Sequence, residues 1–464
     1  MPKIVLLRIP GNHTDWRRRN PIPNLGVGFL SAVARQEGFE TAVLEGHMFL
    51  DSGYLPASLS YPERINFFLE EVRRESPDIL GISVLSGDLA LGIEFAKSYR
   101  KLYPTVKIVM GGVGVNGVAE IISRYAGSAL DFIVKGEGEE TFKNLLREIK
   151  KGAISNFNQI KGLSYRDGQN WRHNPLRPLI KDLDSLPLMT LGDYRHLPAN
   201  IITLLPFERG CPSACNFCFA TETWGSGRYF SVDRIIEQGK ILLNFQGDLK
   251  TLFLSDSNIL AKERLGRASL LEVLKKFPEV VGSINLRVDQ FDNDLIKIFS
   301  RFPNVSPLMG IEALSPKMLQ YLGKTSDPKK YLEDVNRVLP LIRKNKIKYC
   351  LSLIYHIPGE KIEDLNRIRD FFLEQDTERC VLIYLSRLWL EGNTYLWEKY
   401  KKNEFEIYSV AKNPSSILGE QYNDVIFDPS CFLFKNPEIS DYDYAIFSKQ
   451  IRDYFSNTNC NFLG

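Results

Sequence analysis

The sequence of 464 residues has almost no excess of charge of one sign. Its 59 Lys and Arg residues nearly balance its 56 Asp and Glu residues, which leaves a formal net charge of +3. A surface that coats nucleic acid needs a basic stripe, and so small an excess argues against one. We therefore expect no nucleic-acid partner.

Long apolar runs are also missing. No uncharged apolar stretch approaches the roughly 18 residues of a membrane-spanning helix, and the apolar stretch at the N-terminus is too short for a secretion signal. Glycine and proline, at 33 and 24 residues, are near average, which excludes collagen-like and linker-rich chains. We expect a cytoplasmic protein with a large core and no membrane partner.

Cysteine is present but unevenly placed. Three of the seven cysteines, Cys211, Cys215 and Cys218, lie close together, whereas the other four are scattered singly. A disulfide framework is not expected in a cytosolic chain, so a tight triplet suggests a metal ion or a cluster. The scattered cysteines are most simply buried apolar residues, namely Cys350, Cys380, Cys431 and Cys460.

The first 150 residues alternate between strand and helix patterns. Short β-rich runs lie at 3–9, 41–46, 79–85, 107–112 and 131–136, and helical patterns lie at 25–38, 62–75, 89–102, 117–127 and 139–152. Strands separated by helices of this length predict βαβ units and a doubly wound parallel sheet.

A second alternation follows an apparent connector. Six strand patterns with helical segments between them predict a partial (βα)6 barrel, at 202–210, 248–255, 281–289, 306–314, 348–358 and 379–388. The connector is hairpin-like and then proline-containing, and the last 65 or so residues are aromatic-rich and irregular. We therefore expect an α/β chain with four regions, 1–151 (a Rossmann-like domain), 152–198 (connector), 199–400 (barrel) and 401–464 (a short irregular C-terminal region).

The segment ERGCPSACNFCF carries the strongest chemical signal. Its cysteines are spaced Cys-x3-Cys-x2-Cys on a loop after a predicted strand. Three thiolates can hold three irons of a 4Fe–4S cluster, whose usual complement is four cysteines, so one iron would keep an open site. The alternative is a structural zinc site with a fourth ligand elsewhere in the chain.

This motif after the first strand of a (βα) barrel resembles the radical S-adenosylmethionine superfamily. Four further stretches, FLSDSN, LRVDQFD, GIEALSPKML and LIYHIPGE, match in order, so the resemblance covers about residues 200–400. It implies that S-adenosylmethionine chelates the open iron and that an electron from the cluster releases a 5′-deoxyadenosyl radical. It also implies an external electron donor such as flavodoxin or ferredoxin.

The resemblance assigns S-adenosylmethionine contacts to residues near the ends of the predicted strands, where barrel active sites form. Asp256 could instead cap a helix, and Arg287 could form a structural ion pair. The implied contacts are Phe217, Pro358 and Gly359 beside adenine, Ser255, Asp256 and Asn258 at the methionine end, Arg287 at the carboxylate or ribose, and Glu312 toward the cofactor. No catalytic residue is assigned beyond the cluster ligands.

Small residues follow the predicted strands of the first region. A doubly wound domain binds ligands outside these strand ends, and small residues let backbone amides approach a large flat ligand or its phosphate. The first loop lacks GxGxxG, so a dinucleotide is not favoured. The candidate contacts are Gly11, Ser83, Ser86, Gly87, Gly111, Gly112, Gly114 and Gly117.

Residues 1–150 resemble the domain that precedes the barrel in the cobalamin-binding class of the same superfamily. The resemblance rests on NPIPNLGVGFLSAVARQEG, GISVLSGDLALGIEFAK, VMGGVGVNG and GEGEETF, and it implies bound cobalamin. The loop GNHTDWRRR lacks the Asp-x-His-x-x-Gly pattern that supplies an axial histidine, so we expect neither His13 nor His47 to bind cobalt. The alternative is a vestigial Rossmann-like cap without a cofactor.

The combined resemblance implies a cobalamin-dependent radical methyltransferase. It would use a 5′-deoxyadenosyl radical and methylcobalamin to methylate an unactivated carbon of a biosynthetic intermediate, either a small molecule or a peptide. The alternative within the class is a rearrangement, cyclisation or ring contraction without methyl transfer. A hypothesis from another class is a non-catalytic cobalamin or redox sensor. The aromatic residues of region 401–464 could cover the substrate or simply pack on the barrel.

Overall fold

The structure is a computed structural model that describes residues 1–9, 22–56, 58–152, 154–198, 201–245, 252–255, 257–278, 282–375, 378–388, 390, 393–405, 407–409, 432–434, 436–456, 458 and 460–463. The chain forms two compact units. The first contains Met1–Leu204 and part of one later helix, and the second contains most of the chain from Leu205 onward. Among the described residues, no helix is both long and apolar enough to cross a membrane.

The first unit is built on a seven-stranded sheet with the order β2-β1-β3-β4-β5-β6-β7. Its parallel strands are β1 (Lys3–Arg8), β2 (Glu40–Glu45), β3 (Ile79–Ser83), β4 (Lys107–Gly111) and β5 (Phe132–Val134). All five coincide with the predicted runs. The strand order reverses between β1 and β3, which is where ligands of doubly wound sheets bind.

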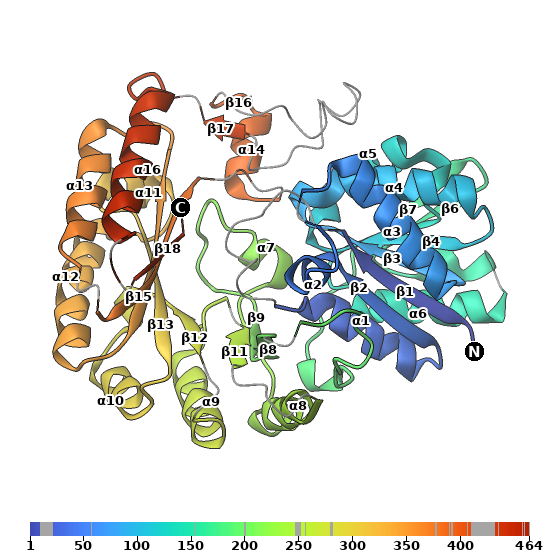
Figure 1. Cartoon of the computed structure of the whole chain (residues 1–464), viewed down its shortest axis with the longest axis horizontal. Helices are drawn as coiled ribbons and strands as arrows, with labels where there is room; N and C mark the ends of the chain where they lie inside the picture. Colours follow the sequence, from blue (N-terminus) through green and yellow to red (C-terminus); the bar gives the residue numbers. More distant parts are fainter. Residues whose placement is uncertain are drawn as a thin grey trace. The chain divides into compact units, whose positions relative to one another are not determined.

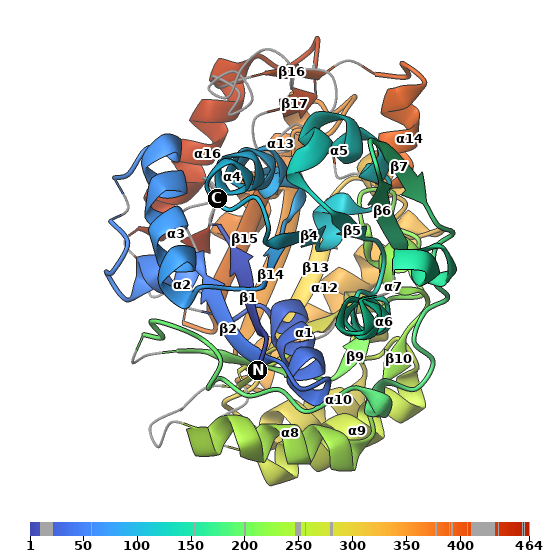
Figure 2. The same ribbon diagram turned by 90° about the vertical axis from the view of Figure 1, so that its right-hand side faces the viewer.

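Helices cover both faces of this sheet, which explains why its strands are almost continuously apolar. Helices α1 (Leu25–Gln36) and α6 (Glu139–Lys151) pack together, and α3 (Tyr61–Glu75), α4 (Leu89–Leu102) and α5 (Ala119–Ala126) pack in sequence on the other face (Figure 2). The Asn24 side chain accepts a hydrogen bond from Val27 N at 3.1 Å and so caps α1. A short helix after β2, α2 (Gly46–Asp51), was not predicted.

Much of the expected connector belongs to this sheet. Strands β6 (Leu163–Asp167) and β7 (Asn170–His173) form an antiparallel hairpin that pairs with β5. Further along, Tyr194 forms a bridge with Val43 of β2 at the opposite edge. The segment therefore covers both sheet edges, which would otherwise expose unpaired backbone groups. Its strands are half exposed and polar, which made them resemble a linker in sequence.

The second unit contains the predicted partial barrel. The first strands, β8 (Thr203–Pro206) and β11 (Leu252–Ser255), pair with each other. A parallel sheet follows with β12 (Ser283–Leu286), β13 (Ser306–Glu312), β14 (Tyr349–Tyr355), β15 (Cys380–Arg387) and β18 (Asn461–Leu463). Helices α9 (Glu263–Lys276), α10 (Asn293–Arg301), α12 (Pro328–Lys344) and α13 (Ile362–Leu373) alternate with these strands (Figure 1). Helix α8 (Val232–Phe245) lies between β8 and β11 in the chain, and most of it belongs to the first unit.

The C-terminal region is more regular than expected from the sequence. It contains α14 (Tyr395–Lys401), the strand pair β16 (Ile407–Ser409) and β17 (Phe432–Phe434), and α16 (Asp441–Phe455). Helix α16 packs on α13, and β18 extends the barrel sheet beside β15. The sequence contains features that indicate α16. Ser440 and Asp443 form a capping box at its start, and Tyr444, Phe447 and Ile451 recur at helical spacing and are buried on one face.

Candidate functional site

The three clustered cysteines lie on one loop between β9 (Glu208–Arg209) and α7 (Ala220–Trp224). Gly210 opens this loop with φ +97°, and a Cβ there would lie 2.5 Å from Trp224 O. The Cys211 amide donates to Gly225 O at 2.8 Å, and Thr221 Oγ1 lies 2.7 Å from the carbonyl oxygen of Cys211. Backbone contacts and one threonine therefore fix the path of the loop.

Asn216 anchors the middle of the loop. Its N–H donates to Leu322 O at 2.8 Å, and its Nδ2 donates to Tyr321 O at 2.6 Å. Its carbonyl oxygen accepts from Leu396 N at 3.1 Å. The loop is thereby tied to the turn after α11 (Pro316–Tyr321). This role was not predicted from the sequence, because an asparagine between cysteines is equally typical of an ordinary turn.

Three thiols on one loop are the type of ligand that an iron–sulfur cluster takes. Burial raises the pKa of Cys215 and raises that of Cys218 to about 11, while Lys324 and Arg287 act in the opposite direction on Cys215. A bound metal deprotonates such thiols outright. Among the described residues, no three His, Cys, Asp or Glu side chains converge closely enough to bind a single metal ion.

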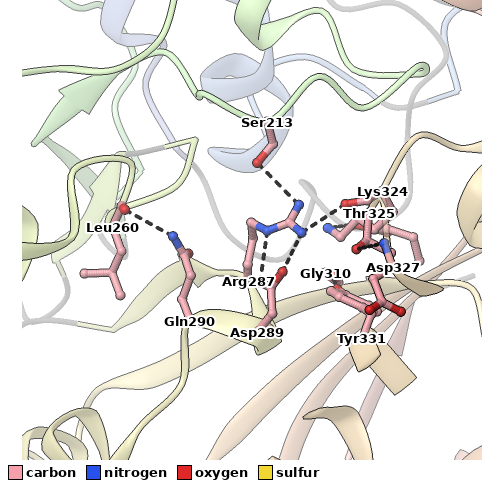
Figure 3. Close-up of polar contacts among 11 residues, drawn as sticks. Ser213, Leu260, Arg287, Asp289, Gln290, Gly310, Lys324, Thr325, Asp327 and Tyr331 are labelled. Carbon is pink, nitrogen blue, oxygen red and sulfur yellow. Dashed lines mark hydrogen bonds and ion pairs between the residues drawn. The ribbon is translucent and has the colours of Figure 1, made fainter. Parts of the chain in front are cut away.

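Arg287 lies directly after β12 and is bound on three sides (Figure 3). Its Nε and Nη2 contact the two carboxylate oxygens of Asp289 at 3.0 and 2.7 Å. Its Nη2 also donates to Lys324 O at 2.9 Å, and its Nη1 donates to Ser213 Oγ on the cysteine loop at 3.3 Å. Burial would lower the pKa of Arg287, but Asp289 raises it overall, so the side chain stays cationic. The guanidinium thus forms the structural ion pair that was the alternative role for Arg287 in the sequence, and it also contacts the cysteine loop.

Glu312 and Lys324 form a buried ion pair beside Arg287. Lys324 Nζ lies 3.1 Å from Glu312 Oε1, and the two residues are only 7% and 8% exposed. Burial would lower the pKa of Lys324, but the nearby Tyr331, Glu312 and Cys215 raise it overall. Glu312 has a positive φ at an irregularity in β13, and Tyr331 OH donates to Gly310 O at 2.8 Å. Lys324 and Tyr331 were missed because a lysine in a turn and a tyrosine on a helix carry no distinctive pattern.

Glu208 is a further buried carboxylate that the sequence analysis did not single out. Its Oε1 accepts hydrogen bonds from Ser257 N and, at 3.1 Å, from Asn258 N, so it holds the segment after β11. Asn258 is 2% exposed, and its Oδ1 accepts from Leu260 N at 3.1 Å. Burial raises the pKa of Glu208 to about 7. The sequence feature that could have identified Glu208 is its position three residues before Cys211 in ERGC.

The remaining expected S-adenosylmethionine contacts are less closely connected to this group. Phe217 is half-buried on the cysteine loop, Ser255 ends β11, and Asp256 lies outside the described residues. Pro358 and Gly359 follow β14, where Gly359 O accepts from Lys317 Nζ at 2.9 Å. The contacts of the described residues thus join the cysteine loop to Arg287, Lys324 and Glu312, but not to the 358–359 turn.

In the first unit, the loops after β3 and β4 pack directly on each other. Gly112 has φ +98°, and a Cβ there would lie 2.5 Å from Val84 O. A Cβ on Gly114 would meet the carbonyl carbon of Leu85 at 2.5 Å, and Gly114 N donates to Val84 O at 3.0 Å. These two glycines are therefore required by the chain's own backbone. This structural role stands beside the role predicted from the sequence, which is backbone access for a ligand and stays a prediction.

The same loops leave small residues at the strand ends. Ser83, Ser86, Gly87 and Gly111 are partly exposed, and Gly117 is exposed with φ +75°. These partly exposed small residues leave backbone accessible at this edge, which fits a broad, flat ligand such as cobalamin. Gly11 and His13 lie outside the described residues, and His47 is buried in α2.

A buried charge group lies beside this edge, at the switch in strand order. Arg8 ends β1, and its Nη1 lies 3.1 Å from Glu45 Oε1 at the end of β2. Its Nη2 lies 3.9 Å from Asp88 Oδ2. All three residues are at most 4% exposed.

The fold and the two strand edges define a barrel with a cysteine-loop site and a doubly wound domain with a backbone-lined edge. Family models match both parts: "B12 binding domain" over residues 17–146 and "Radical SAM superfamily" over residues 205–372. The chain therefore combines a B12 binding domain with a radical S-adenosylmethionine domain, and its cofactors are a 4Fe–4S cluster, S-adenosylmethionine and cobalamin.

Individual proteins similar to this chain agree with that assignment. An uncharacterized methyltransferase of Pyrococcus horikoshii is 27% identical over 82% of this chain and 81% of its own length. The anaerobic magnesium-protoporphyrin IX monomethyl ester cyclase of Rubrivivax gelatinosus is 24% identical over 64% of this chain and 54% of its own length. The radical S-adenosylmethionine methyltransferase TsrM of Kitasatospora setae, solved with tryptophan and a cofactor analogue, shares the fold with a TM-score of 0.73 at 16% identity, covering 98% of this chain and 89% of that chain.

Proposed function

We propose that this chain is a methyltransferase that methylates an unactivated carbon of a biosynthetic intermediate. The observation that carries the proposal is the similarity to the P. horikoshii methyltransferase across both domains, over 82% of this chain. The fold shared with TsrM, which was solved with its substrate tryptophan, supports a small-molecule substrate, and a peptide is the alternative. When bound, the cofactors supply a 5′-deoxyadenosyl radical for hydrogen abstraction and a methyl group carried on cobalt.

The roles of the barrel residues follow from their chemistry. We propose that Cys211, Cys215 and Cys218 bind the cluster and that Arg287 and Lys324 supply positive charge beside it. A zwitterionic amino-acid group needs an anion and a cation, and Glu312 and Lys324 form such a pair at 3.1 Å. Glu208 would hold the segment around Asn258 at the methionine end. The remaining proposed contacts are Phe217, Ser255, Asp256, Pro358 and Gly359.

In the first unit, we propose that cobalamin lies over the strand edge formed by the β3 and β4 loops. The partly exposed small residues there would contact it through backbone groups, and neither His13 nor His47 would bind cobalt. The proposed contacts are Gly11, Ser83, Ser86, Gly87, Gly111, Gly112, Gly114 and Gly117. We further propose reduction by an external flavodoxin or ferredoxin, a location in the cytoplasm, and no nucleic-acid partner.

Product analysis tests the reaction type. A methyl transfer needs one S-adenosylmethionine as methyl source and another as radical source, so S-adenosylhomocysteine and 5′-deoxyadenosine should form in equal amounts. Methyl-labelled S-adenosylmethionine should pass its label to a product that is heavier by one methylene unit. Anaerobic reactions with intermediates from neighbouring biosynthetic genes provide the substrates to be tried.

A cyclisation is the second candidate, and the similarity to the R. gelatinosus cyclase over 64% of this chain favours it. This reaction predicts 5′-deoxyadenosine coupled to product without S-adenosylhomocysteine. A product of unchanged or lower mass would therefore contradict methyl transfer and support the second candidate.

A further inference from the structure

We infer that the C-terminal helix α16 is a positioning element of the S-adenosylmethionine site, because Tyr444 and Glu360 together fix the loop 356–359 after β14. The inference rests on the proposed role of Pro358 and Gly359 beside adenine. It gives a role to part of the C-terminal region, which the sequence left open.

The Glu360 side chain holds the start of this loop by accepting hydrogen bonds from the loop's backbone N–H groups. The Glu360 side chain is 1% exposed, and its Oε2 accepts from His356 N at 2.8 Å and from Ile357 N at 3.4 Å. Tyr444 OH, from the first turns of α16, donates to the same oxygen at 3.1 Å. Three donors from two separate segments thus meet at one carboxylate oxygen.

A second side chain strengthens this junction. Asn436 Nδ2 lies 2.9 Å from Glu360 O and 3.0 Å from Tyr444 OH, so it can donate to both. The His356 ring stacks on the Tyr444 ring, with centroids 3.9 Å apart and planes 14° apart. Asn436 and Tyr444 of the C-terminal segment therefore contact the Glu360 carboxylate, the Glu360 carbonyl oxygen and the His356 ring.

The loop needs such support because its backbone is unusual. His356 has φ +62°, which is unfavourable for a residue with a side chain and persists only where the surroundings enforce it. Without the bonds to Glu360, this conformation would compete with ordinary extended ones. The segment that bears Pro358 and Gly359 would then lose its fixed position.

The polar groups at this junction are not needed to attach the helix. Helix α16 already packs through apolar rings, with Phe447 against Tyr355 at 5.5 Å and Phe455 against Phe372 at 6.0 Å between centroids. Burying a carboxyl group and a phenol costs free energy that an apolar pair would not. Among the described residues, Glu360 has no ion-pair partner, and burial raises its pKa to about 8. Ordering the loop explains why polar groups lie here.

The variant Tyr444→Phe tests the inference because it removes one hydroxyl and leaves the ring. Tyr454→Phe is the matched control, since that hydroxyl lies on the same helix and donates to Leu373 O at 3.3 Å, away from the loop. Hydrogen exchange of the His356 and Ile357 amides, measured in the full chain, should accelerate about fivefold in Tyr444→Phe, as expected for the loss of the hydrogen bond from this hydroxyl to Glu360. The control should match the wild type.

The second measurement is the affinity of the cluster-loaded protein for S-adenosylmethionine, by equilibrium dialysis. Tyr444→Phe should weaken it about fivefold without changing the iron content. Affinity for methionine, which lacks the adenosyl group, should stay unchanged. Glu360→Gln keeps an acceptor oxygen and should have a smaller effect than Glu360→Ala, which leaves the loop amides unpaired.

Two results would overturn the inference, and they are distinguishable from failure of the proposed function. If Tyr444→Phe lowers thermal stability but leaves amide exchange and S-adenosylmethionine affinity at the level of Tyr454→Phe, the helix is merely structural. An equal loss of methionine affinity would place the effect elsewhere than at the adenine loop. If the wild type itself binds no S-adenosylmethionine, the proposed function fails as well.

Discussion

The carboxyl ends of the parallel strands are built differently in the two units. In the first unit, the loops after β3 and β4 touch backbone to backbone, and a Cβ at Gly112 would lie 2.5 Å from Val84 O. In the barrel, charged side chains fill the corresponding place, with Arg287 bound to Asp289 and Lys324 bound to Glu312. The edge of the first unit is built from backbone contacts and depends on glycines that carry no side chain. The edge of the barrel is built from charged side chains and depends on the pairing of opposite charges. The two edges should therefore fail for different reasons.

The largest effect is expected at the barrel edge from loss of a cluster ligand. Cys215→Ala should abolish both the 4Fe–4S cluster and 5′-deoxyadenosine formation, because two thiolates cannot hold the cluster in place of three. Iron content and 5′-deoxyadenosine are measured after anaerobic reconstitution. Cys350→Ala, which changes a buried cysteine of β14, is the control and should keep the iron. Full iron content in Cys215→Ala would show that the cysteine loop is not the cluster site.

Removing one member of the buried ion pair should give the next largest effect. Lys324→Met leaves the Glu312 carboxylate buried without its cation, which should lower the free energy of unfolding by about 3 to 5 kcal/mol. The double variant Lys324→Met with Glu312→Gln removes both charges and should recover most of that loss. Denaturant unfolding of the three proteins measures the coupling. A cost below about 1 kcal/mol for Lys324→Met would match an exposed pair and would contradict charge balance as the basis of this edge.

A glycine substitution tests the backbone-built edge of the first unit. Gly112→Ala adds a Cβ against Val84 at a backbone conformation, φ +98° and ψ 172°, that is nearly restricted to glycine. We expect a loss of about 2 to 3 kcal/mol in the unfolding of this unit. Gly136→Ala is the control, because Gly136 has φ +74° but nothing within 4 Å of its added Cβ, and it should cost about 1 kcal/mol. Equal losses would show that backbone conformation alone, and not the contact between the loops, decides the effect.

The sequence predicted the elements of both units better than it predicted their sites. Strand runs are recognisable because a sheet covered on both faces requires continuous apolar segments. The five parallel strands of the first unit and the barrel strands β8 and β11 to β15 coincide with predicted runs. The cysteine loop was equally visible, because thiolate spacing is local. The hairpin of β6 and β7 was recognised as hairpin-like but was assigned to the connector, and β18 was missed, since short or half-exposed strands have weak patterns and are stabilised by their neighbours.

The missed site residues have a common physical cause. Lys324 meets Glu312, and Tyr444 meets Glu360, across separations of 12 and 84 residues. No local pattern specifies such pairs, because a lysine in a turn usually remains in solvent and a tyrosine on a helix usually packs in the core. The role of Gly112 was predicted as ligand access, whereas its contact with Val84 depends on how two loops meet after folding. Motifs identify the cofactor chemistry, and tertiary packing selects the residues that support it.

The smallest expected effect is on the pH dependence of stability, and it arises from Glu208, a buried carboxyl group of the barrel. Burial raises the pKa of Glu208 to about 7, above its ordinary value near 4.5, because the hydrogen bonds from Ser257 and Asn258 only partly offset the cost of a buried charge. Between these two values the unfolded chain releases its proton while the folded chain keeps it, so stability should fall as pH rises from about 4.5 to 7. Glu208→Gln stays neutral and should show a shallower decline of thermal midpoint over this range, with the two proteins most similar at the acidic end. Glu360, whose pKa burial also raises, would leave part of the slope in this variant, and adding Glu360→Gln should flatten it further. Parallel pH profiles for wild type and Glu208→Gln would mean that Glu208 is ionised throughout, and the hydrogen bonds to Ser257 and Asn258 would then outweigh its burial.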